Sequence, residues 1–304
     1  MGKKKYLMMT VAFLLYVLPS IALADVHISL KLRGALGYHL ASGLNNGTKD
    51  FLLWGRTYFT PPSEGGVKLD YRALHAGYEW GGDIIFELSP KVGFFIGAGY
   101  LQISKSPGLH SPMQTITAYS EDWTEFFSDT KVTAIPLRLG LNLTRPLGRS
   151  FDFTGSLGIA YYLHARYDAR LVVWQPSFWL LEEPWQITHT TAEKKRFPLG
   201  LQAGLGIEYK AVKRMAFFIE ALANYARFRG LEGTTVSEEG AFGGFFPSFS
   251  EQGKLYYESV PIIPNAPRLI MVQSSPPAGP GGEPREAVVD FSSVSLQAGI
   301  RIRF

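Results

Sequence analysis

The sequence predicts an all-β fold, a transmembrane eight-stranded antiparallel up-and-down β-barrel. Three observations predict it: segments in which apolar and polar residues alternate, connectors that alternate between long and short, and an export signal with no later apolar run of helix-spanning length. Every backbone polar group that crosses lipid must be paired. A chain without spanning helices therefore crosses a membrane only as a closed barrel.

The last eleven residues, Val294 to Phe304, show the alternation most plainly. Side chains of a strand point alternately to its two faces. One face is wholly apolar and consists of Val294, Leu296, Ala298, Ile300, Ile302 and Phe304. The other face consists of Ser295, Gln297, Gly299, Arg301 and Arg303. Such an apolar ladder at the chain terminus is expected to face lipid or an assembly factor.

The first 24 residues have the pattern of a secretory signal peptide. Three lysines precede an apolar stretch from about Leu7 to Ile21, and Ala22-Leu23-Ala24 supplies a small-x-small cleavage site. A membrane anchor is the alternative, but the apolar core is shorter than the roughly 20 residues that a span needs. We therefore expect cleavage after Ala24, with Ala22 and Ala24 as the signal residues, and export across the inner membrane. Residues 25–304 would form a single barrel domain.

Composition excludes several other classes of protein. Without the signal peptide the chain carries 27 basic and 26 acidic residues, so its apparent basicity gives no reason to expect a nucleic-acid partner. An exported chain with no cysteine is not a disulfide scaffold. The sequence has no metal-ligand cluster, phosphate-binding glycine loop or redox motif, so we expect no cofactor.

Eight segments share the two-residue alternation. They are residues 26–40, 71–80, 92–102, 132–142, 151–166, 197–210, 215–227 and 294–304. The connectors after the first, third, fifth and seventh segments are long: roughly 42–70, 104–131, 167–196 and 230–290. Those after the fourth and sixth are short (144–150 and 211–214), and residues 81–91 form an intermediate connector that contains a tight Ser89-Pro90-Lys91 turn. Four long extracellular loops and short periplasmic turns are typical of bacterial outer-membrane barrels.

The longest connector leaves one alternative open. Residues 255–260 and 268–273 flank a proline-containing stretch and are expected to form a hairpin above the membrane. If this hairpin joined the wall, the barrel would have ten strands. Its arms are short and interrupted by prolines, which favours eight.

In these features the chain resembles the small eight-stranded outer-membrane β-barrel proteins, the family of OmpA-like, OmpX-like and OmpW-like barrels. The resemblance covers the whole predicted mature chain and implies a monomer in the lipid of a bacterial outer membrane. It also implies that the barrel-assembly machinery recognises the last strand, which makes Phe304, Ile302 and Ile300 assembly-signal residues.

The polar faces of the segments would meet inside the barrel, where eight strands leave room for side chains or one small ligand. The expected interior network consists of Arg33, Glu79, Arg138, Glu208, Glu220, Arg301 and Arg303. We expect Glu79, Glu208, Arg301 and Arg303 near the periplasmic end and the others nearer the middle. A paired polar core that plugs the barrel is favoured over a narrow solute path.

An enzyme is the less favoured alternative. Some barrels of this kind modify lipid with a histidine, a serine and a carboxylate at the rim. His39 or His164, both expected to point inward, with Ser42 or Asp168, would be the candidates here. No spacing of a catalytic triad stands out, and a triad cannot be recognised from spacing alone. We expect no enzymatic activity.

Aromatic residues gather in the predicted extracellular loops. They are Trp54, Trp123, Trp174, Phe178, Trp179 and Trp185. Apolar clusters of this size in loops usually mark contacts. The rings would cap the barrel, join an interfacial aromatic belt or line a ligand site. The sequence thus favours a non-enzymatic barrel whose loops contact an unknown extracellular ligand or surface. The rivals are an OmpW-like channel for small apolar solutes and a soluble periplasmic barrel with an apolar interior.

Overall fold

The computed structural model describes most of the chain beyond residue 26. The described residues are 27–41, 44–45, 68–69, 74–104, 114–118, 122–174, 185–196, 198–241, 244–245, 249–259, 267–276 and 285–304. The expected signal peptide, including Ala22 and Ala24, lies outside them. Within the described part, no helix has the length and apolar character needed to cross a membrane.

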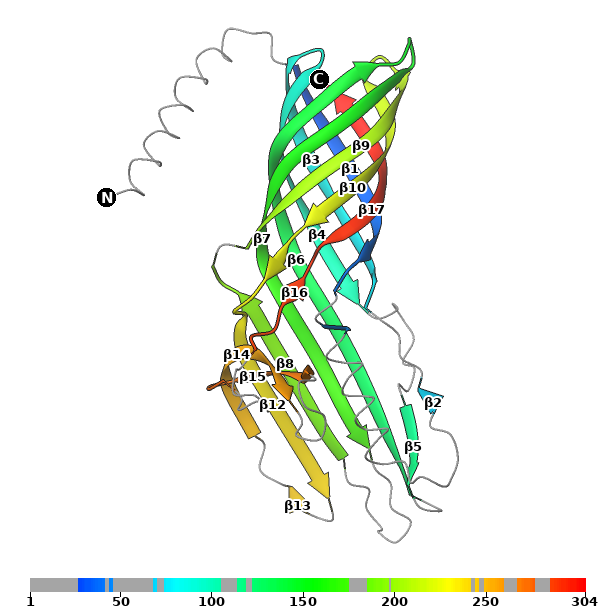
Figure 1. Ribbon diagram of the computed structural model, residues 1–304. Helices are drawn as coiled ribbons and strands as arrows, with labels where there is room; N and C mark the ends of the chain where they lie inside the picture. The colour runs from blue at the N-terminus through cyan, green and yellow to red at the C-terminus, as the bar shows by residue number, and fades with distance from the viewer. Residues whose placement is uncertain are drawn as a thin grey trace, which may run out of the picture.

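Eight antiparallel strands form a closed barrel (Figure 1). They are β1 (His27–His39), β3 (Ala76–Ser89), β4 (Val92–Ser104), β6 (Asp122–Pro146), β7 (Phe151–Trp174), β9 (Leu199–Val212), β10 (Met215–Tyr225) and β17 (Ser293–Arg303). Each strand pairs with the next one in this order, and β17 pairs with β1 to close the wall. The expected eight-stranded antiparallel barrel is confirmed.

The barrel exterior is apolar along its full height. Outward positions of the wall strands expose large side chains that a water-soluble protein would bury, such as Leu205 (62%) and Leu296 (62%). Aromatic residues flank this apolar belt at both ends, as in membrane barrels. At one end they are Tyr38, Tyr78, Trp80 and Tyr225; at the other they are Phe151, Tyr209 and Phe304. With its polar interior, this exterior excludes the soluble barrel with an inward apolar face.

The three short turns lie at the end of the barrel where the chain terminates, which we call the short-turn end (Figure 1). They connect β3 to β4 through Pro90 and Lys91, β6 to β7, and β9 to β10. The turn at Ser89-Pro90-Lys91 is confirmed, but the second strand differs from expectation. It begins at Ala76 and continues to Ser89, so residues 81–89 are strand and not connector. The run Ile84-Ile85-Phe86 hides the alternation there, because inward Ile85 is as apolar as its outward neighbours.

Strands also fill much of the long connectors. Strands β6 and β7 extend beyond the barrel and pair along their whole length. Further strands pair with the outer edges of this extension and form an outer sheet (Figure 1). It comprises β2 (Lys68–Leu69), β5 (Gln114–Ala118), β8 (Trp185–Lys194), β12 (Glu232–Ala241), β13 (Gly244–Phe245), β14 (Phe249–Ser259) and β15 (Pro267–Gln273). The connectors expected at 104–131 and 167–196 are thus largely strand.

The predicted hairpin of the last connector exists as β14 and β15, and it stays outside the barrel wall. Strand β14 pairs with β12 of the outer sheet and with β15. The ten-stranded alternative is therefore wrong. A separate two-stranded pair, β11 (Arg227–Phe228) and β16 (Val289–Asp290), lies where the barrel meets the outer sheet, at the end that we call the outer mouth.

Replacing Leu205 by arginine tests the lipid-facing exterior. Leu205 lies halfway along β9, so the arginine would place a charge near the middle of the apolar belt. We expect a loss of about 2–4 kcal/mol in the free energy of unfolding, measured by urea titration of the barrel in phospholipid vesicles. The control Ser250→Arg adds the same charge to an exposed position of the outer sheet. Equal losses in the two variants would contradict a lipid-facing β9.

Candidate functional site: the filled barrel interior

Three cations and three carboxylates meet halfway along the barrel interior. Arg33 and Arg138 both contact Glu79, at 3.0 and 3.1 Å. The same two guanidinium groups lie 3.8 and 3.5 Å from Asp83. Lys31 pairs with Glu220. A buried charge is tolerated only when it is paired, so the equal numbers keep this level electrically balanced.

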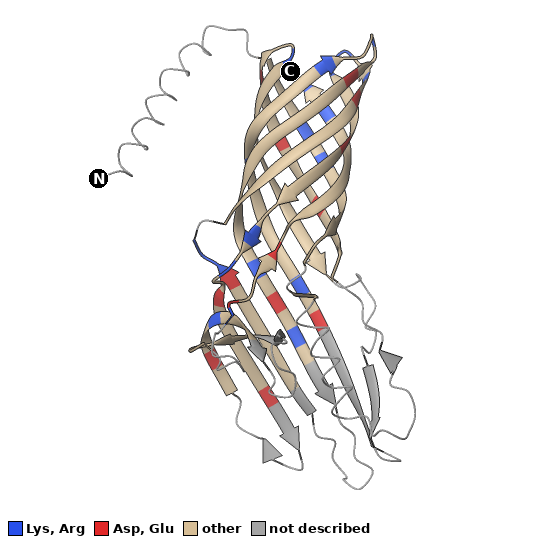
Figure 2. Ribbon diagram, viewed as in Figure 1, with Lys and Arg blue, Asp and Glu red and all other residues tan. Residues whose placement is uncertain are grey.

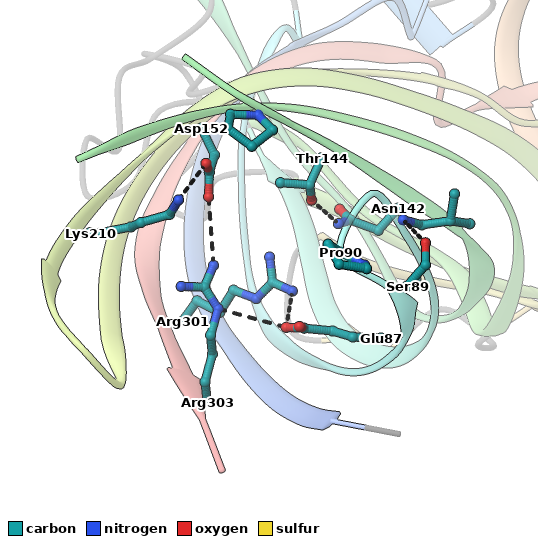
Figure 3. Close-up of a pocket in the computed structure, with 12 residues that line it drawn as sticks. Glu87, Ser89, Pro90, Asn142, Thr144, Asp152, Lys210, Arg301 and Arg303 are labelled. Atoms are coloured by element: carbon teal, nitrogen blue, oxygen red, sulfur yellow. Dashed lines mark hydrogen bonds and ion pairs between the residues drawn. The ribbon is translucent and has the colours of Figure 1, made fainter. Parts of the chain in front are cut away.

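A second level of ion pairs lies near the short-turn end (Figure 3). Arg301 bridges Glu87 (2.7 Å) and Glu208 (3.1 Å). Arg303 also contacts Glu208. Asp152 forms an ion pair with Lys210 at 2.6 Å. A cavity of about 230 Å³ is lined by Glu87, Asp152, Lys210, Arg301 and Arg303, so this end of the interior is partly hollow.

The mid-level leaves almost no free space. The void among Lys31, Arg33, Asp83 and Glu220 measures about 20 Å³, close to the volume that a single water requires. Glycines on neighbouring strands provide the room that the carboxylates occupy. A Cβ atom at Gly97 would overlap the carboxylate of Asp83, and one at Gly204 would overlap that of Glu220. These two glycines therefore make room for carboxylates.

The outer mouth is closed by an apolar cluster, which we call the seal. Tyr162, Phe228 and Phe291 form its aromatic centre, with ring centroids 5.4–5.7 Å apart. Further buried residues complete it: Ala41, Leu44, Leu74, Leu101, Ile103, Val132, Ala134, Ala160, Ala165, Tyr167, Ala192, Ala226, Leu231, Leu255, Val272, Ala287 and Val289. Burial raises the pKa of the Tyr167 phenol above its ordinary value. Members come from β4, β6 and β7, from residues just beyond the mouth ends of β1, β3, β10 and β17, and from the outer sheet, so the seal crosses the lumen.

The structure brings the seven expected network residues into two groups. Arg301, Arg303 and Glu208 meet near the short-turn end, and Arg33 and Arg138 meet near the middle. Glu220 is at mid-level, where it pairs with Lys31. The expected position of Glu79 is wrong. Because β3 extends to Ser89, Glu79 lies opposite Ala35 at mid-level.

Two interior acids, Asp83 and Glu87, escaped the sequence analysis because they lie in the part of β3 assigned to a connector. Glu87 occupies the place beside Arg301 that was expected for Glu79. The alternation of Ile84, Phe86 and Leu88 with Asp83 and Glu87 was the available signal.

The histidines weighed as catalytic candidates do not assemble a triad within the described residues. His164 is exposed and contacts Glu193 at 3.0 Å, while Asp168 pairs with Arg166. The inward orientation expected for His164 is wrong. A register shift on the facing strand between Thr133 and Ile135, with a positive φ of 49° at His164, turns the ring outward. His39 is buried in the barrel interior, and Ser42 lies outside the described residues.

The loop aromatics divide into two sets. Trp54, Phe178 and Trp179 lie outside the described residues. The backbones of Trp123, Trp174 and Trp185 lie in β6, β7 and β8, so these three belong to strands of the outer sheet. Trp174 and Trp185 are register partners.

Comparison with known proteins finds solved structures that resemble this chain. No model of a known family and no curated protein matches the chain. One match is a major outer membrane protein from Thermus thermophilus, with 10% identity, a TM-score of 0.37 and coverage of 91% of this chain and 99% of that chain. A second is Ail, the attachment invasion locus protein of Yersinia pestis, in complex with the heparin analogue sucrose octasulfate, with 9% identity, a TM-score of 0.34 and coverage of 92% and 100%.

A third match is the outer membrane protease OmpT from Escherichia coli, with 9% identity, a TM-score of 0.27 and coverage of 92% of this chain and 97% of that chain. At these identities and TM-scores the matches carry no functional conclusion. The closed eight-stranded wall, the apolar exterior with its aromatic flanks and the charged interior themselves define the class. The chain folds as a small β-barrel of the outer-membrane type.

Replacing Gly204 by alanine tests the interior packing. The added Cβ would displace Glu220 from Lys31 and from Ser156, which donates to Glu220 at 2.7 Å. We expect the free energy of unfolding to fall by about 2 kcal/mol, since a buried charge loses its partner. Gly155→Ala is the matched control, because its Cβ meets other atoms only at 3.8 Å or beyond. Urea titration in vesicles measures both variants, and equal stabilities would contradict the packing described.

Proposed function

We propose that this protein is a sealed, non-enzymatic barrel of the bacterial outer membrane that holds the outer sheet outside the cell for contact with a ligand or surface. The apolar seal above two levels of paired charges is the observation that carries the proposal. A barrel that conducts solutes needs a continuous path. Here the mid-level void is about 20 Å³ and the outer mouth is closed by packed rings.

The outer sheet supports a contact role because its strands continue the barrel wall. Strands β6 and β7 run without interruption from the short-turn end into the sheet, so the barrel holds it rigidly. The outward face of β7 and β8 exposes a mixture of charged and polar side chains, including Arg166, Arg170 and His189. The opposite face packs into the seal through Tyr167 and Ala192. A polar face on a fixed support is well suited to binding.

The rival function, passage of small apolar solutes, finds less support in the described residues. Small apolar molecules entering from the outer mouth would have to displace the seal and then cross the buried ion pairs of the mid-level. Transfer of an apolar molecule through a charged, filled interior is unfavourable. The candidate histidine and aspartate do not meet each other, because His164 contacts Glu193 and Asp168 contacts Arg166.

We also propose that the last strand is the assembly signal. Phe304 is 72% exposed on the barrel exterior, and its amide donates to the carbonyl of Ile28 at 2.9 Å. Ile302 and Ile300 lie on the same outward face, opposite Leu30 and Leu32 of β1. A folding factor that binds β17 before this strand pairs with β1 would contact this row of apolar side chains.

Planar-bilayer recording tests the sealed barrel. The wild-type protein is expected to give no stable unitary conductance, because neither the mid-level nor the outer mouth has an open path. Stable conductance steps, or uptake of apolar solutes into vesicles, would overturn the proposal in favour of the transport function.

A variant in which both the mid-level and the seal are opened is the positive control for the recording. It combines Phe228→Ser with replacement of four mid-level charges, Arg33→Ser, Glu79→Ser, Asp83→Ser and Arg138→Ser. Removing both signs together avoids an unpaired buried charge. We expect conductance steps from this variant once its heat-modifiable migration on a gel shows that it has folded.

Labelling of single cysteines tests location and orientation in cells. The chain has no native cysteine, so one introduced thiol reports one position. Ser250 in the outer sheet and Ser150 in a short turn are both exposed and allow matched Ser→Cys changes. We expect a membrane-impermeant maleimide to label Ser250→Cys in intact cells and Ser150→Cys only after the outer membrane is opened. The reverse pattern, or labelling of neither before opening, would contradict the proposed location.

A further inference from the structure

Among the described residues, the side chains of the three short turns include exposed cations and no acids. The turns span residues 88–92, 144–151 and 211–215, and their only charged side chains are Lys91, Arg145, Arg149, Lys213 and Arg214, all exposed. We call these five residues the basic rim. None of them has an ion-pair partner within the described part of the chain. Figure 2 shows basic residues at this end of the barrel.

The neighbouring interior charges do not cancel the rim. The acids closest to it are Glu87, Asp152 and Glu208, and all three are paired with Arg301, Arg303 or Lys210. The interior at this level therefore contributes equal numbers of both signs. At the outer mouth, by contrast, several cations are paired with acids, as in Arg227–Asp290 and Lys195–Glu232. The side chains of the short turns therefore carry positive charge that no acid within those turns compensates.

Apolar side chains in the same turns fix the depth of the rim. Leu147, between Arg145 and Arg149, is 57% exposed, and Val212, beside Lys213, is 59% exposed. Exposed apolar residues next to long cationic side chains are typical of a membrane interface. There the apolar group enters the hydrocarbon and the charge reaches the headgroups.

We propose that the basic rim binds the phosphate groups of anionic phospholipids in the leaflet that surrounds the short turns. The inference rests on the proposed membrane location. Arginine suits this role because its planar donors match phosphate oxygens, and the rim contains three arginines. Each Lys or Arg close to an anionic membrane surface strengthens association with that surface roughly fivefold. Five cations on one rim thus select anionic lipid over zwitterionic lipid around the barrel.

Spin-label electron paramagnetic resonance tests the proposal. The barrel is reconstituted in phosphatidylcholine vesicles that contain a trace of spin-labelled phosphatidylglycerol or spin-labelled phosphatidylcholine. The measurement gives the association of each lipid with the protein surface. We expect the wild-type barrel to prefer phosphatidylglycerol about fivefold, and we expect 0.5 M salt to weaken the preference by screening.

Two five-residue variants separate charge from structure. One replaces every rim residue by glutamine and is expected to show no preference between the two lipids. The matched control exchanges arginine for lysine and lysine for arginine, so the charge is kept and most of the preference should remain. A glutamine variant that keeps the full preference would overturn the proposal.

Two further readouts complete the test. Soluble polyphosphate that binds the wild-type barrel, in the absence of any preference between the lipids, would assign the rim to a soluble polyanion and overturn the lipid proposal. Insertion into pure phosphatidylcholine vesicles is measured separately by heat-modifiable gel migration. Failure to insert would contradict the proposed membrane function itself, whereas normal insertion with equal lipid binding would contradict only the lipid inference.

Discussion

The pairing of the first and last wall strands is the interaction on which the structure depends. It runs from Ser29 opposite Arg303 to His39 opposite Ser293. In hydrocarbon an unpaired backbone amide or carbonyl costs several kcal/mol, so an open edge along β1 or β17 could not persist. Closure removes both edges at once. Closure also determines the environment of each wall side chain, because alternate residues of a strand face the lipid and the barrel interior.

Closure creates the interior, and the interior charges follow from its narrow width. Eight strands enclose a space that side chains can fill. The polar faces supply cations and acids in equal numbers at two levels, and glycines such as Gly97 and Gly204 yield the space for carboxylates. Toward the outer mouth the inward residues become apolar and pack as the seal around Phe228 and Phe291.

The sequence predicts the barrel well because each wall strand carries its own local alternation. Turns are equally local, and Ser89-Pro90-Lys91 was recognisable without tertiary information. The alternation is lost where inward residues are apolar, as at Ile85. Because β3 was therefore expected to end too early, Glu79 was predicted near the short-turn end and not at mid-level. The seal could not be predicted from the sequence, because residues as distant along the chain as Ala41 and Phe291 come together only when the barrel closes. Of the outer sheet only the hairpin of β14 and β15 was expected. The buried face of β8 and β12 consists largely of threonine and serine, so these strands show no apolar period.

Amide hydrogen exchange in lipid nanodiscs, followed residue by residue by NMR, tests closure most directly. The amides at the β1–β17 seam, for example Leu32 and Ile300, have partners only if the wall is closed. Closure predicts exchange there as slow as in the interior pair of β9 and β10, represented by Leu205 and Ala221. Fast exchange along β1 and β17, beside slow exchange in β9 and β10, would show an open sheet and contradict the account.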